Sequence, residues 1–556
     1  MSPESWLPTP GIVLEPNAAA AVREVDHNTA IAAGPGAGKT ELLAQRANYL
    51  FETGACPPPH RVIAVSFKVD AAANLRARVA ERCGSRTARR FDSYTFHAFA
   101  RTIIARHREV VADKVPPNFT VGRGRTETQL AYGDLLPLAL RILDQDDRAA
   151  KILRQSYSFA FFDEFQDCTS QQFELIRKVF GDSDIRTTAV GDSKQRIMGW
   201  AGALDDAMKD YLTHFSAAEL PIYQNHRSLN RLRRVQNSVI KVMDPAAAVE
   251  DDEIASCTAD ELATDGEVHV LGFASATDEA RTLCELILQD IDQGTPPSEI
   301  AVLTVHEPDL IGEELVQLLA DRGVPVRHEQ TAQDAFGEPV GELILDMARL
   351  LALGLAPDEY TRIGEFMTRY CVDERQADRR RRRFDQFLKE TRSAIATGAV
   401  DLSEAAVFEA VMFEFLKVCH RQYLSRLSVE YTDDLALTAA ARAAIAVINE
   451  AIAQSDTPRT AMGRLSQDDA IRLLTVHKSK GLEFDHVYLV AVENECFFDG
   501  AEEGRPTYFV GISRARAKLV LTYVQQRELL LPAPHWWRKE RRGLQEFLEY
   551  AAAESG

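Results

Sequence analysis

The chain has 556 residues, a formal net charge of −19, 46% hydrophobic residues and 26% charged residues. This length exceeds what one hydrophobic core supports, so we expect several domains. The composition is that of a soluble globular protein, and no apolar run reaches the roughly 18 residues that a membrane span needs. Residues 1–10 lack the basic and apolar segments of a secretory signal, so we predict a cytoplasmic protein with no membrane partner.

The cysteines and the charge exclude further classes. The eight cysteines stand singly, without the Cys-x-x-Cys pairs typical of zinc and iron–sulfur sites. The negative net charge argues against indiscriminate nucleic-acid binding, so any DNA path must be a confined basic stripe. Five consecutive arginines at residues 379–383 are one candidate. Their acidic neighbours favour a solvated, charge-paired helix face as much as a contact with duplex DNA.

The first predicted elements are a strand, a loop and a helix. Thr29–Ala32 is a short apolar run, and residues 41–44 open a helical pattern. The segment between them consists of Ala33, Gly34, Pro35, Gly36, Ala37, Gly38, Lys39 and Thr40. Such a loop lets backbone N–H groups hold the phosphates of a nucleoside triphosphate at a helix N-terminus. We expect Lys39 to reach the β- and γ-phosphates and the Thr40 hydroxyl to ligate Mg²⁺.

Further strand-like runs at residues 62–65, 159–162 and 187–190 alternate with helical patterns. This alternation predicts a parallel sheet covered by helices on both faces. Asp163 and Glu164 directly follow the second run, at the sheet edge where ligands usually bind. We expect Asp163 to ligate Mg²⁺ and Glu164 to orient or deprotonate the attacking water.

A second α/β pattern begins near Glu219 and is interrupted by a long helical stretch. Its strand-like runs are residues 267–271, 300–303, 471–476, 487–490 and 519–522. We therefore predict an α/β fold with two parallel-sheet domains in tandem, each with a mainly helical insertion. The expected ranges are 1–100 and 156–215 for the first domain, 101–155 for its insertion, 216–336 and 468–556 for the second domain, and 337–467 for its insertion.

Eight segments stand in a distinctive order along the chain. They are residues 33–40, 66–72, 95–100, 163–167, 190–195, 224–228, 475–484 and 510–515, with Asp-Glu-Phe-Gln-Asp at 163–167 and Thr-Val-His-Lys-Ser-Lys-Gly-Leu-Glu-Phe at 475–484. In order and approximate spacing, they resemble the motifs of the UvrD/Rep/PcrA helicases of superfamily 1. The resemblance extends to about residue 522. It implies two RecA-like domains, ATP and Mg²⁺ as cofactors, and DNA as the partner.

The resemblance also implies roles for single residues. Gln195 would sense the γ-phosphate, and Glu483 would hydrogen-bond the ribose. Arg227 and Arg514 would complete the site from the second sheet domain by stabilising charge on the phosphates. Single-stranded DNA would cross both sheet domains, with some bases stacked on aromatic rings. The residues implied in DNA contact are Ser66, Phe67, His97, Trp200, Thr475 and His477.

Some positions depart from the family pattern. Ala18 stands where the family usually has a glutamine that reads adenine, and Met198 replaces an aromatic residue. Both insertions are reduced, which predicts weaker unwinding by the chain alone. We predict that Trp536 and Trp537 either present an aromatic wedge at a duplex junction or cap the second sheet domain.

These observations lead to one main hypothesis and one alternative. The main hypothesis is an ATP-dependent DNA helicase or single-stranded DNA translocase, with the 3′–5′ polarity that the resemblance implies. Its substrates would be single-stranded and tailed duplex DNA. The alternative is a partner-dependent, DNA-stimulated ATPase subunit that works with a separate nuclease in repair or phage defence.

Overall fold

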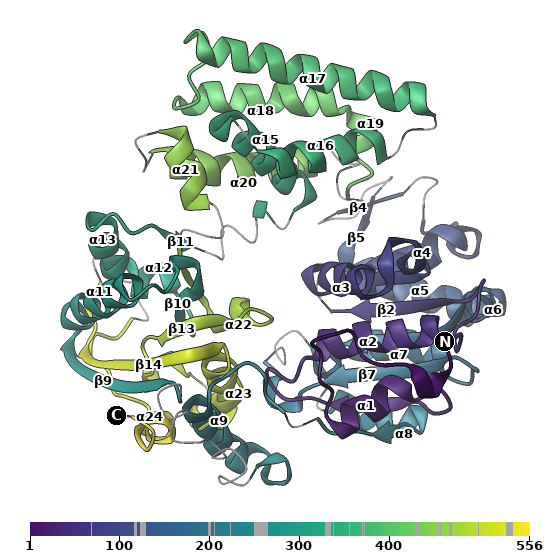
Figure 1. Ribbon diagram of the computed structural model, residues 1–556, viewed down its shortest axis with the longest axis horizontal. Helices are drawn as coiled ribbons and strands as arrows, with labels where there is room; N and C mark the ends of the chain where they lie inside the picture. Colours follow the sequence, from purple (N-terminus) through teal and green to yellow (C-terminus); the bar gives the residue numbers. More distant parts are fainter. Residues whose placement is uncertain are drawn as a thin grey trace.

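The structure is a computed structural model. It describes residues 1–555 except 68, 116–118, 123–128, 198–201, 205, 223, 250–264, 329–334, 337, 355, 370, 372, 429–430, 432–433, 454, 456, 466–469, 499 and 530–536. In the described part, two parallel sheets of six strands each lie side by side, and a helical unit lies above them in Figure 1. The predicted α/β class with two parallel-sheet domains in tandem is therefore confirmed.

The first sheet contains strands from both sides of the first insertion. From edge to edge its strands are β3 (Phe91–Thr95), β2 (Arg61–Ser66), β6 (Tyr157–Asp163), β7 (Arg186–Gly191), β1 (Thr29–Ala32) and β8 (Ala218–Glu219). One face is covered by α1 (Pro16–Arg23), α2 (Lys39–Glu52) and α3 (Val69–Ala88). The other face is covered by α4 (Phe96–Arg106), α5 (Leu135–Gln145), α6 (Asp147–Ser156), α7 (Ser170–Phe180) and α8 (Ala207–Phe215).

The central residues 159–162 of strand β6 are all apolar because both faces of the strand are covered. Phe159 and Phe161 pack in the core under α1, α2 and α3, whereas Ala160 and Phe162 pack in the core on the opposite face. Alternate side chains of a strand point to opposite faces, so a strand covered on both sides needs apolar residues throughout. The strand ends at Asp163, which places a carboxylate at the carboxyl edge of the sheet.

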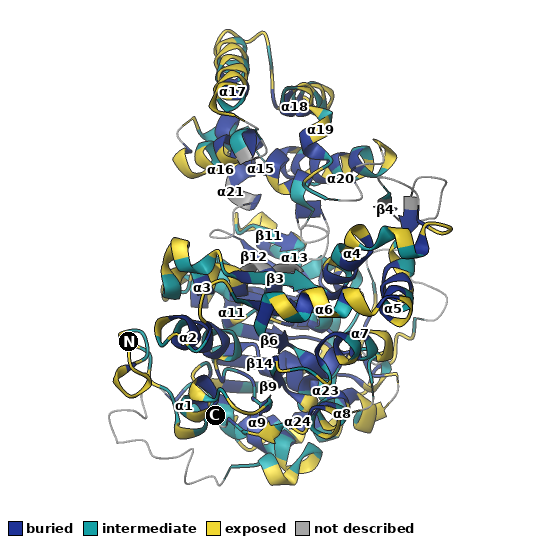
Figure 2. Ribbon diagram, turned by 90° about the vertical axis from the view of Figure 1, so that its right-hand side faces the viewer, coloured by how far each residue is buried: buried dark blue, intermediate teal, exposed yellow. Residues whose placement is uncertain are grey.

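The second sheet is built in the same way. From edge to edge its strands are β11 (Val326–His328), β12 (Ile471–Thr475), β10 (Ile300–Thr304), β13 (Phe484–Leu489), β14 (Ala515–Gln526) and β9 (Glu267–Ser275). Its helices are α9 (Asn230–Met243), α11 (Ala276–Asp292), α12 (Pro308–Ile311), α13 (Glu313–Asp321), α22 (Val476–Ser479), α23 (Gly500–Ile512) and α24 (Gln545–Ala552). Figure 2 shows buried strands enclosed by helices that are exposed on their outer sides.

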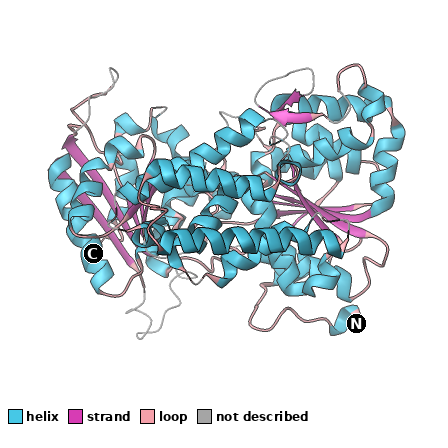
Figure 3. Ribbon diagram, turned by 90° about the horizontal axis from the view of Figure 1, so that it is seen from above, coloured by secondary structure: helices cyan, strands magenta, loops and turns pink. Residues whose placement is uncertain are grey.

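The helical unit is inserted between β11 and β12 of the second sheet. Its helices are α15 (Pro339–Leu353), α16 (Pro357–Arg369), α17 (Glu374–Ala396), α18 (Ala405–Cys419), α19 (Arg421–Leu424), α20 (Asp434–Ala453) and α21 (Pro458–Leu465). They share one core of their own. Seen from above in Figure 3, its long helices extend from the side of one sheet toward the other.

One described helix, α20, is long and apolar enough by length and composition to cross a membrane. The sequence nevertheless has no uninterrupted apolar run of about 18 residues, since Arg442 and Glu450 lie within α20. Leu437, Ala441, Ile445 and Ile448 of α20 are buried in the core of the helical unit, where the helix packs against α15 and α21. Its apolar residues thus serve the packing of this unit, and the cytoplasmic location remains a prediction.

Several predicted elements differ in extent from the observed ones. Strand β14 extends from Ala515 to Gln526, well beyond the predicted residues 519–522, and β13 begins at Phe484 rather than at residue 487. The short strand β8 pairs with β1, so the first sheet continues past residue 215. In the first insertion, β4 (Thr120–Gly122) and β5 (Gln129–Ala131) form a small parallel pair that periodicity did not predict.

Candidate nucleotide and DNA site

The predicted phosphate loop joins the end of β1 to the start of α2. Gly36 and Gly38 both have a φ of +72°, a backbone conformation that favours glycine. Lys39 and Thr40 form the first turn of α2, where helix N–H groups lack intrahelical partners and can bind an anion. The Lys39 ammonium donates a 3.4 Å hydrogen bond to the Ala33 carbonyl. The ammonium therefore lies over the loop that is predicted to hold phosphates.

The segment at residues 224–228, which leads into the second sheet domain, lies directly against this loop. The His226 backbone N–H donates a 3.0 Å hydrogen bond to the Gly36 carbonyl. A Cβ at Gly36 would lie 2.2 Å from Asn225 Oδ1 and 2.7 Å from Arg227 Cβ. Only glycine fits at this position, because any side chain would push the segment that carries Arg227 away from the phosphate loop.

Asp163 and Glu164 form the acidic pair at the end of β6. Asp163 is 4% exposed, and its carboxylate accepts a 3.0 Å hydrogen bond from the Glu164 backbone N–H. Glu164 has a φ of +51°, a strained conformation for a non-glycine residue that is typical of functional sites. Burial and the adjacent Glu164 charge raise the pKa of Asp163. Burial alone would raise the pKa of Glu164, but the charges of Lys39 and Lys480 outweigh it and lower this pKa.

A chain of hydrogen bonds connects Glu164 to the second sheet domain. The Gln166 amide donates to Glu164 Oε2 over 2.6 Å, and Gln166 Oε1 accepts from the Asp192 backbone N–H over 3.0 Å. The Asp192 carboxylate accepts from Gln195 Nε2 over 2.8 Å. Gln195 Oε1 in turn accepts from Arg514 Nη2 over 2.9 Å. The catalytic candidate Glu164 is thus joined to the arginine of the other domain through side chains and one peptide group.

A second contact between the two sheet domains lies beside this chain. The Lys480 ammonium donates to Asp167 Oδ2 over 2.6 Å and to the Gln195 carbonyl over 2.9 Å. The Lys480 and Asp167 side chains are both almost fully buried. A buried ion pair is costly when one partner is removed, so this pair favours contact between the domains. Gln166, Asp167 and Lys480 belong to the sequence motifs at 163–167 and 475–484, but the sequence alone assigns them no role.

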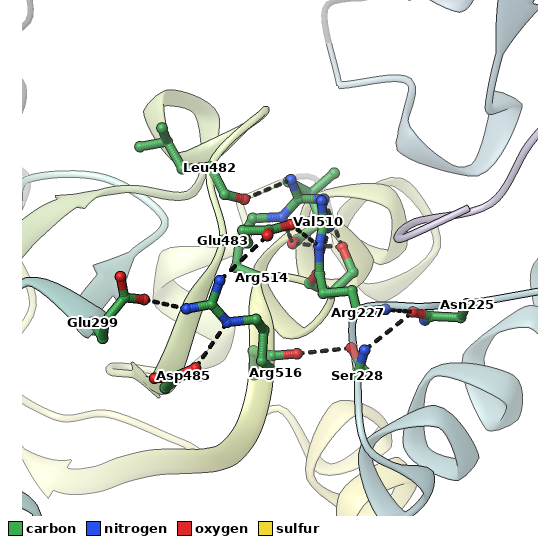
Figure 4. Close-up of polar contacts among 12 residues, drawn as sticks. Asn225, Arg227, Ser228, Glu299, Leu482, Glu483, Asp485, Val510, Arg514 and Arg516 are labelled. Carbon is green, nitrogen blue, oxygen red and sulfur yellow. Dashed lines mark hydrogen bonds and ion pairs between the residues drawn. The ribbon is translucent and has the colours of Figure 1, made fainter. Parts of the chain in front are cut away.

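Arg227 is held by residues of the second sheet domain, as Figure 4 shows. Its Nε donates to Glu483 Oε2 over 2.7 Å, and its Nη1 donates to the Ser513 carbonyl over 3.0 Å. Glu483 also accepts a 3.3 Å hydrogen bond from Arg516 Nη1. The carboxylate predicted to bind a ribose is therefore occupied by two arginines in this structure.

Arg514 is 2% exposed and lies close to Arg227 in Figure 4. Its guanidinium donates to the carbonyls of Val510 and Leu482 as well as to Gln195. Burial and the charge of Arg227 lower the pKa of Arg514 to about 9. A buried cation beside another cation gains stability from a nearby anion, so the site is suited to a polyphosphate.

The chemistry of the residues around the phosphate loop fits Mg²⁺. Thr40 and Asp163 supply oxygen donors, the ligand type that Mg²⁺ prefers together with phosphate and water. Ser66 pairs with Asp163 in the register of β2 and β6, and its buried hydroxyl has no hydrogen-bond partner among the described residues. Within those residues, no group of three or more His, Cys, Asp or Glu forms a metal site.

The candidate DNA-contacting residues that the structure describes lie at the carboxyl edges of both sheets. Ser66 ends β2 and is fully buried, whereas Phe67, the next residue, is partly buried. His97 lies in the first turn of α4. Its ring lies 4.8 Å from that of Tyr132, and burial lowers its pKa. Thr475 caps α22, which contains His477. Trp200 and Met198 lie outside the described residues, and so does Trp536.

Two features near the site bear on the departures from the family pattern. Ala18 is buried in α1 against the first sheet, and the adjacent Asn17 donates a 2.7 Å hydrogen bond to the Pro221 carbonyl. Neither side chain is therefore available as a free donor to a base in this structure. Trp537 donates from its indole to the Arg527 carbonyl and stacks under Arg541, which supports the capping alternative for this residue.

Comparison with protein families and curated proteins gives one consistent match. Residues 14–123 and 121–216 match the UvrD/REP helicase N-terminal domain, and residues 414–526 match the UvrD-like helicase C-terminal domain. DNA helicase II of Escherichia coli (strain K12) is 23% identical over 90% of this chain and 83% of its own length. ATP-dependent DNA helicase Rep of the same strain is 23% identical over 94% of this chain and 93% of its own length. A probable DNA helicase II homolog of Mycoplasma capricolum is 23% identical over 91% of this chain.

The matched ranges contain most of the site just described. The N-terminal match includes the phosphate loop, the acidic pair and Gln195, and the C-terminal match includes Lys480, Glu483 and Arg514. Both matches belong to one helicase type and together cover more than half of the chain. The two parallel sheets and the order of the motifs agree with them, and the chain belongs to the UvrD/Rep family of DNA helicases.

Proposed function

We propose that this chain is an ATP-driven motor that moves 3′ to 5′ along single-stranded DNA and thereby separates strands. The observation that carries the proposal is the hydrogen-bond chain from Glu164 through Gln195 to Arg514. It joins the predicted water-activating group of one sheet domain to a cation of the other. A change at the γ-phosphate therefore affects groups on both sides of the domain interface at once.

In this proposal the phosphate loop and α2 bind the triphosphate of ATP. The loop N–H groups and the Lys39 ammonium hold the phosphates, and Thr40 and Asp163 hold Mg²⁺. When bound, Mg²⁺ would neutralise charge on the β- and γ-phosphates. To reach a phosphate, Lys39 must give up its 3.4 Å hydrogen bond to the Ala33 carbonyl. This exchange is favourable because an ammonium binds a charged phosphate more strongly than a neutral carbonyl.

Hydrolysis needs one base and several cations. Glu164, whose lowered pKa keeps it ionised, would accept a proton from water. The water oxygen then bonds to the γ-phosphorus, and the bond to the ADP oxygen breaks. Arg227 and Arg514 would leave their protein partners and stabilise the charge on the phosphates. This exchange of partners would draw the two sheets together before hydrolysis and release them afterwards.

The strand would lie on the carboxyl edges of both sheets, near Phe67, His97, Thr475 and His477. Their elements come from both sides of the domain interface, so changes in that interface would shift the grip on the strand. The names of the relatives support DNA as the substrate. The polarity and the aromatic contact at Trp200 rest on the family resemblance.

Two tailed duplexes test the proposal. Strand separation with ATP is expected on a duplex with a 3′ single-stranded tail and not on one with a 5′ tail. ATP turnover should rise when single-stranded DNA is added. The Trp200→Ala variant should retain basal turnover and lose most of this stimulation. A preference for the 5′ tail, or turnover that ignores DNA, would refute the proposed motor.

A second candidate function is a DNA-stimulated ATPase that needs a separate nuclease subunit. The alignment with E. coli DNA helicase II extends over 628 positions, more than the 556 residues of this chain. The relative thus has segments without counterpart here, and such segments are candidates for gripping a duplex. Stimulated ATP turnover without strand separation by the chain alone would favour this candidate over the first.

A further inference from the structure

The loop that follows β7 belongs to the first sheet domain but is held in the second. It begins at Asp192, and its turn Ser193–Gln195 packs against α23. Ile197 at its other end packs in the hydrophobic core of the second sheet domain. Gln195 Oε1 accepts a 2.9 Å hydrogen bond from Arg514 of that domain. The predicted γ-phosphate sensor therefore lies on a segment that is fixed in both domains.

One lysine of this loop lies between carboxylates of the two sheet domains. The Lys194 ammonium is 3.0 Å from Asp192 Oδ1 in its own loop and 4.0 Å from Asp244 Oδ2. Asp244 directly follows α9, whose apolar residues pack in the core of the second sheet domain. Unpaired carbonyls at the C-terminal end of a helix also favour a nearby cation. The charge of Lys194 is therefore attracted to both domains.

The Asp192 carboxylate divides its two oxygens between Lys194 and the sensor. Its side chain has no exposed surface. Oδ1 contacts the Lys194 ammonium, whereas Oδ2 accepts a 2.8 Å hydrogen bond from Gln195 Nε2. A buried carboxylate that loses its cation is left uncompensated, which is costly. Lys194 therefore acts on Gln195 through the carboxylate that orients it.

A cavity of about 540 Å³ lies beside Lys194 and is bounded by both sheet domains. Its wall in the first domain includes Gly34 and Pro35 of the phosphate loop and residues of α8, and its wall in the second domain includes residues of α9. Protein interiors are otherwise closely packed, so open space at a domain interface leaves room for movement. The distance between Lys194 and Asp244 can therefore change without a steric clash.

We propose that Lys194 is a positioning residue that couples the γ-phosphate sensor Gln195 to the position of α9 in the second sheet domain. Two carboxylates share its ammonium. Movement of Asp244 toward Lys194 would draw the ammonium away from Asp192, and this carboxylate would then hold Gln195 differently. The proposal rests on the proposed function in taking ATP as the ligand and Gln195 as the sensor of its γ-phosphate.

The other interpretation is a surface ion pair that has no effect on the reaction. Exposed pairs contribute little, because water and salt screen them. The Lys194 side chain is 12% exposed and that of Asp244 is 38% exposed. The contact with buried Asp192 should therefore resist salt, whereas the contact with Asp244 should weaken as salt is added. Salt dependence thus distinguishes the two contacts of Lys194.

The test compares variants of the full chain. Lys194→Gln removes both contacts, Asp244→Asn removes only the contact between the domains, and Lys194→Arg keeps the charge. The matched controls are Lys209→Gln on α8 and Glu219→Gln in β8, two exposed residues that line the same cavity. The readouts are phosphate release without DNA, equilibrium binding of ADP and thermal unfolding.

Lys194→Gln should lower kcat about tenfold relative to Lys209→Gln, whereas ADP should bind equally well because the phosphate loop is intact. Lys194→Arg should recover most of the lost kcat. Asp244→Asn should lower kcat about threefold relative to Glu219→Gln at about 50 mM salt, and by less at about 500 mM. The double variant of Lys194→Gln and Asp244→Asn should be no slower than Lys194→Gln alone, because both changes remove the same contact.

Three results would overturn the proposal. One is a kcat of Lys194→Gln equal to that of Lys209→Gln. Another is a loss of kcat in Lys194→Gln that Lys194→Arg does not recover, or that a matching loss of thermal stability explains. The last is an additive effect of Lys194→Gln and Asp244→Asn. None of these measurements needs DNA, so hydrolysis without movement along DNA would refute the proposed motor while the variants still decide the role of Lys194.

Discussion

The carboxyl edges of the two sheets hold their functional groups in opposite ways. At the first sheet, the phosphate loop and the acidic pair are set by short segments directly after β1 and β6. At the second sheet, Arg227 and Arg514 are satisfied by protein groups, including Glu483 and the carbonyls of Ser513 and Leu482. The first edge is arranged to receive a ligand, whereas the second must exchange partners to contact one.

This difference suggests how ligand binding would be coupled to movement. A ligand shifts a conformational equilibrium only by its different affinity for the two states. The first edge supplies binding groups in either state. The arginines of the second edge supply the difference, because they reach a phosphate only after leaving their present partners. Substitutions at each edge, and in the hydrogen bonds between them, test this division.

Removal of the lysine of the first edge should abolish activity. Lys39→Ala takes away the ammonium closest to the phosphate loop, so ATP turnover should fall to background with or without DNA. The measurement is phosphate release by the full chain. Lys151→Ala, an exposed lysine on α6, is the matched control and should retain full turnover. Residual hydrolysis by Lys39→Ala above background would refute the site assignment.

Removal of an arginine of the second edge should leave ligand binding largely intact but slow the reaction. Arg227→Ala is expected to lower kcat by about 10²–10³-fold, the range found when one charge-stabilising donor is lost. Turnover is compared with that of Arg231→Ala, whose ion pair is with Asp265. An Arg227→Ala enzyme with normal kcat and a raised KM would show instead that Arg227 only helps ATP to bind.

Breaking the connection between the edges should have an intermediate effect. Gln166→Leu keeps the side-chain volume but removes the hydrogen bonds to Glu164 and to the Asp192 backbone. We expect kcat to fall about tenfold with little change in the KM for ATP, since the residue positions Glu164 rather than the nucleotide. Gln171→Leu on the exposed side of α7 is the control. Equal changes in kcat and stability for both variants would contradict a positioning role.

The smallest expected effect concerns how α2 is anchored. Burial alone would raise the pKa of Glu41, but hydrogen bonds from Arg82, Gln45 and Arg78 outweigh it and lower this pKa to about 2. This is below its ordinary value of 4.5, so the carboxylate stabilises the fold above about pH 4.5, and the contribution is lost as pH falls toward 2. Glu41→Gln should cost about 1 kcal/mol at pH 7, allowing for solvent screening.

Thermal unfolding at two pH values measures this contribution. The Tm difference between Glu41→Gln and the unmodified chain should shrink when the pH is lowered from neutral toward about 3. Glu81→Gln, whose side chain is more exposed, should have a smaller effect at neutral pH. A Tm difference that grows toward acid would contradict the assigned role of Glu41.

The first edge was predictable because its features are local in sequence. Strand, loop and helix at residues 29–44 follow one another directly, and Asp163 and Glu164 stand at the end of one apolar run. Helix start and strand end are fixed by neighbouring residues, so the motif and its geometry coincide. The order of the motifs likewise led to the correct family and to the two parallel sheets.

The second edge was less predictable because its contacts join distant segments. Arg514 and Gln195 are 319 residues apart, and Lys480 and Asp167 are 313 apart. No local pattern shows which carboxylate or amide a given cation will meet. The arginine run shows the same limit: charge patterning left its role open, and only the packing of α17 separated buried Arg380 from the exposed cations. The roles of the individual site residues remain predictions.

The central claim is that hydrolysis requires residues of both sheets. Its most direct test is ATP turnover by Arg514→Ala in the presence of single-stranded DNA, together with equilibrium binding of ATP. We predict that ATP still binds, because the phosphate loop and Lys39 are intact, while turnover falls about 10³-fold or more. Turnover at the rate of the unmodified chain would contradict the claim and confine the chemistry to the first sheet.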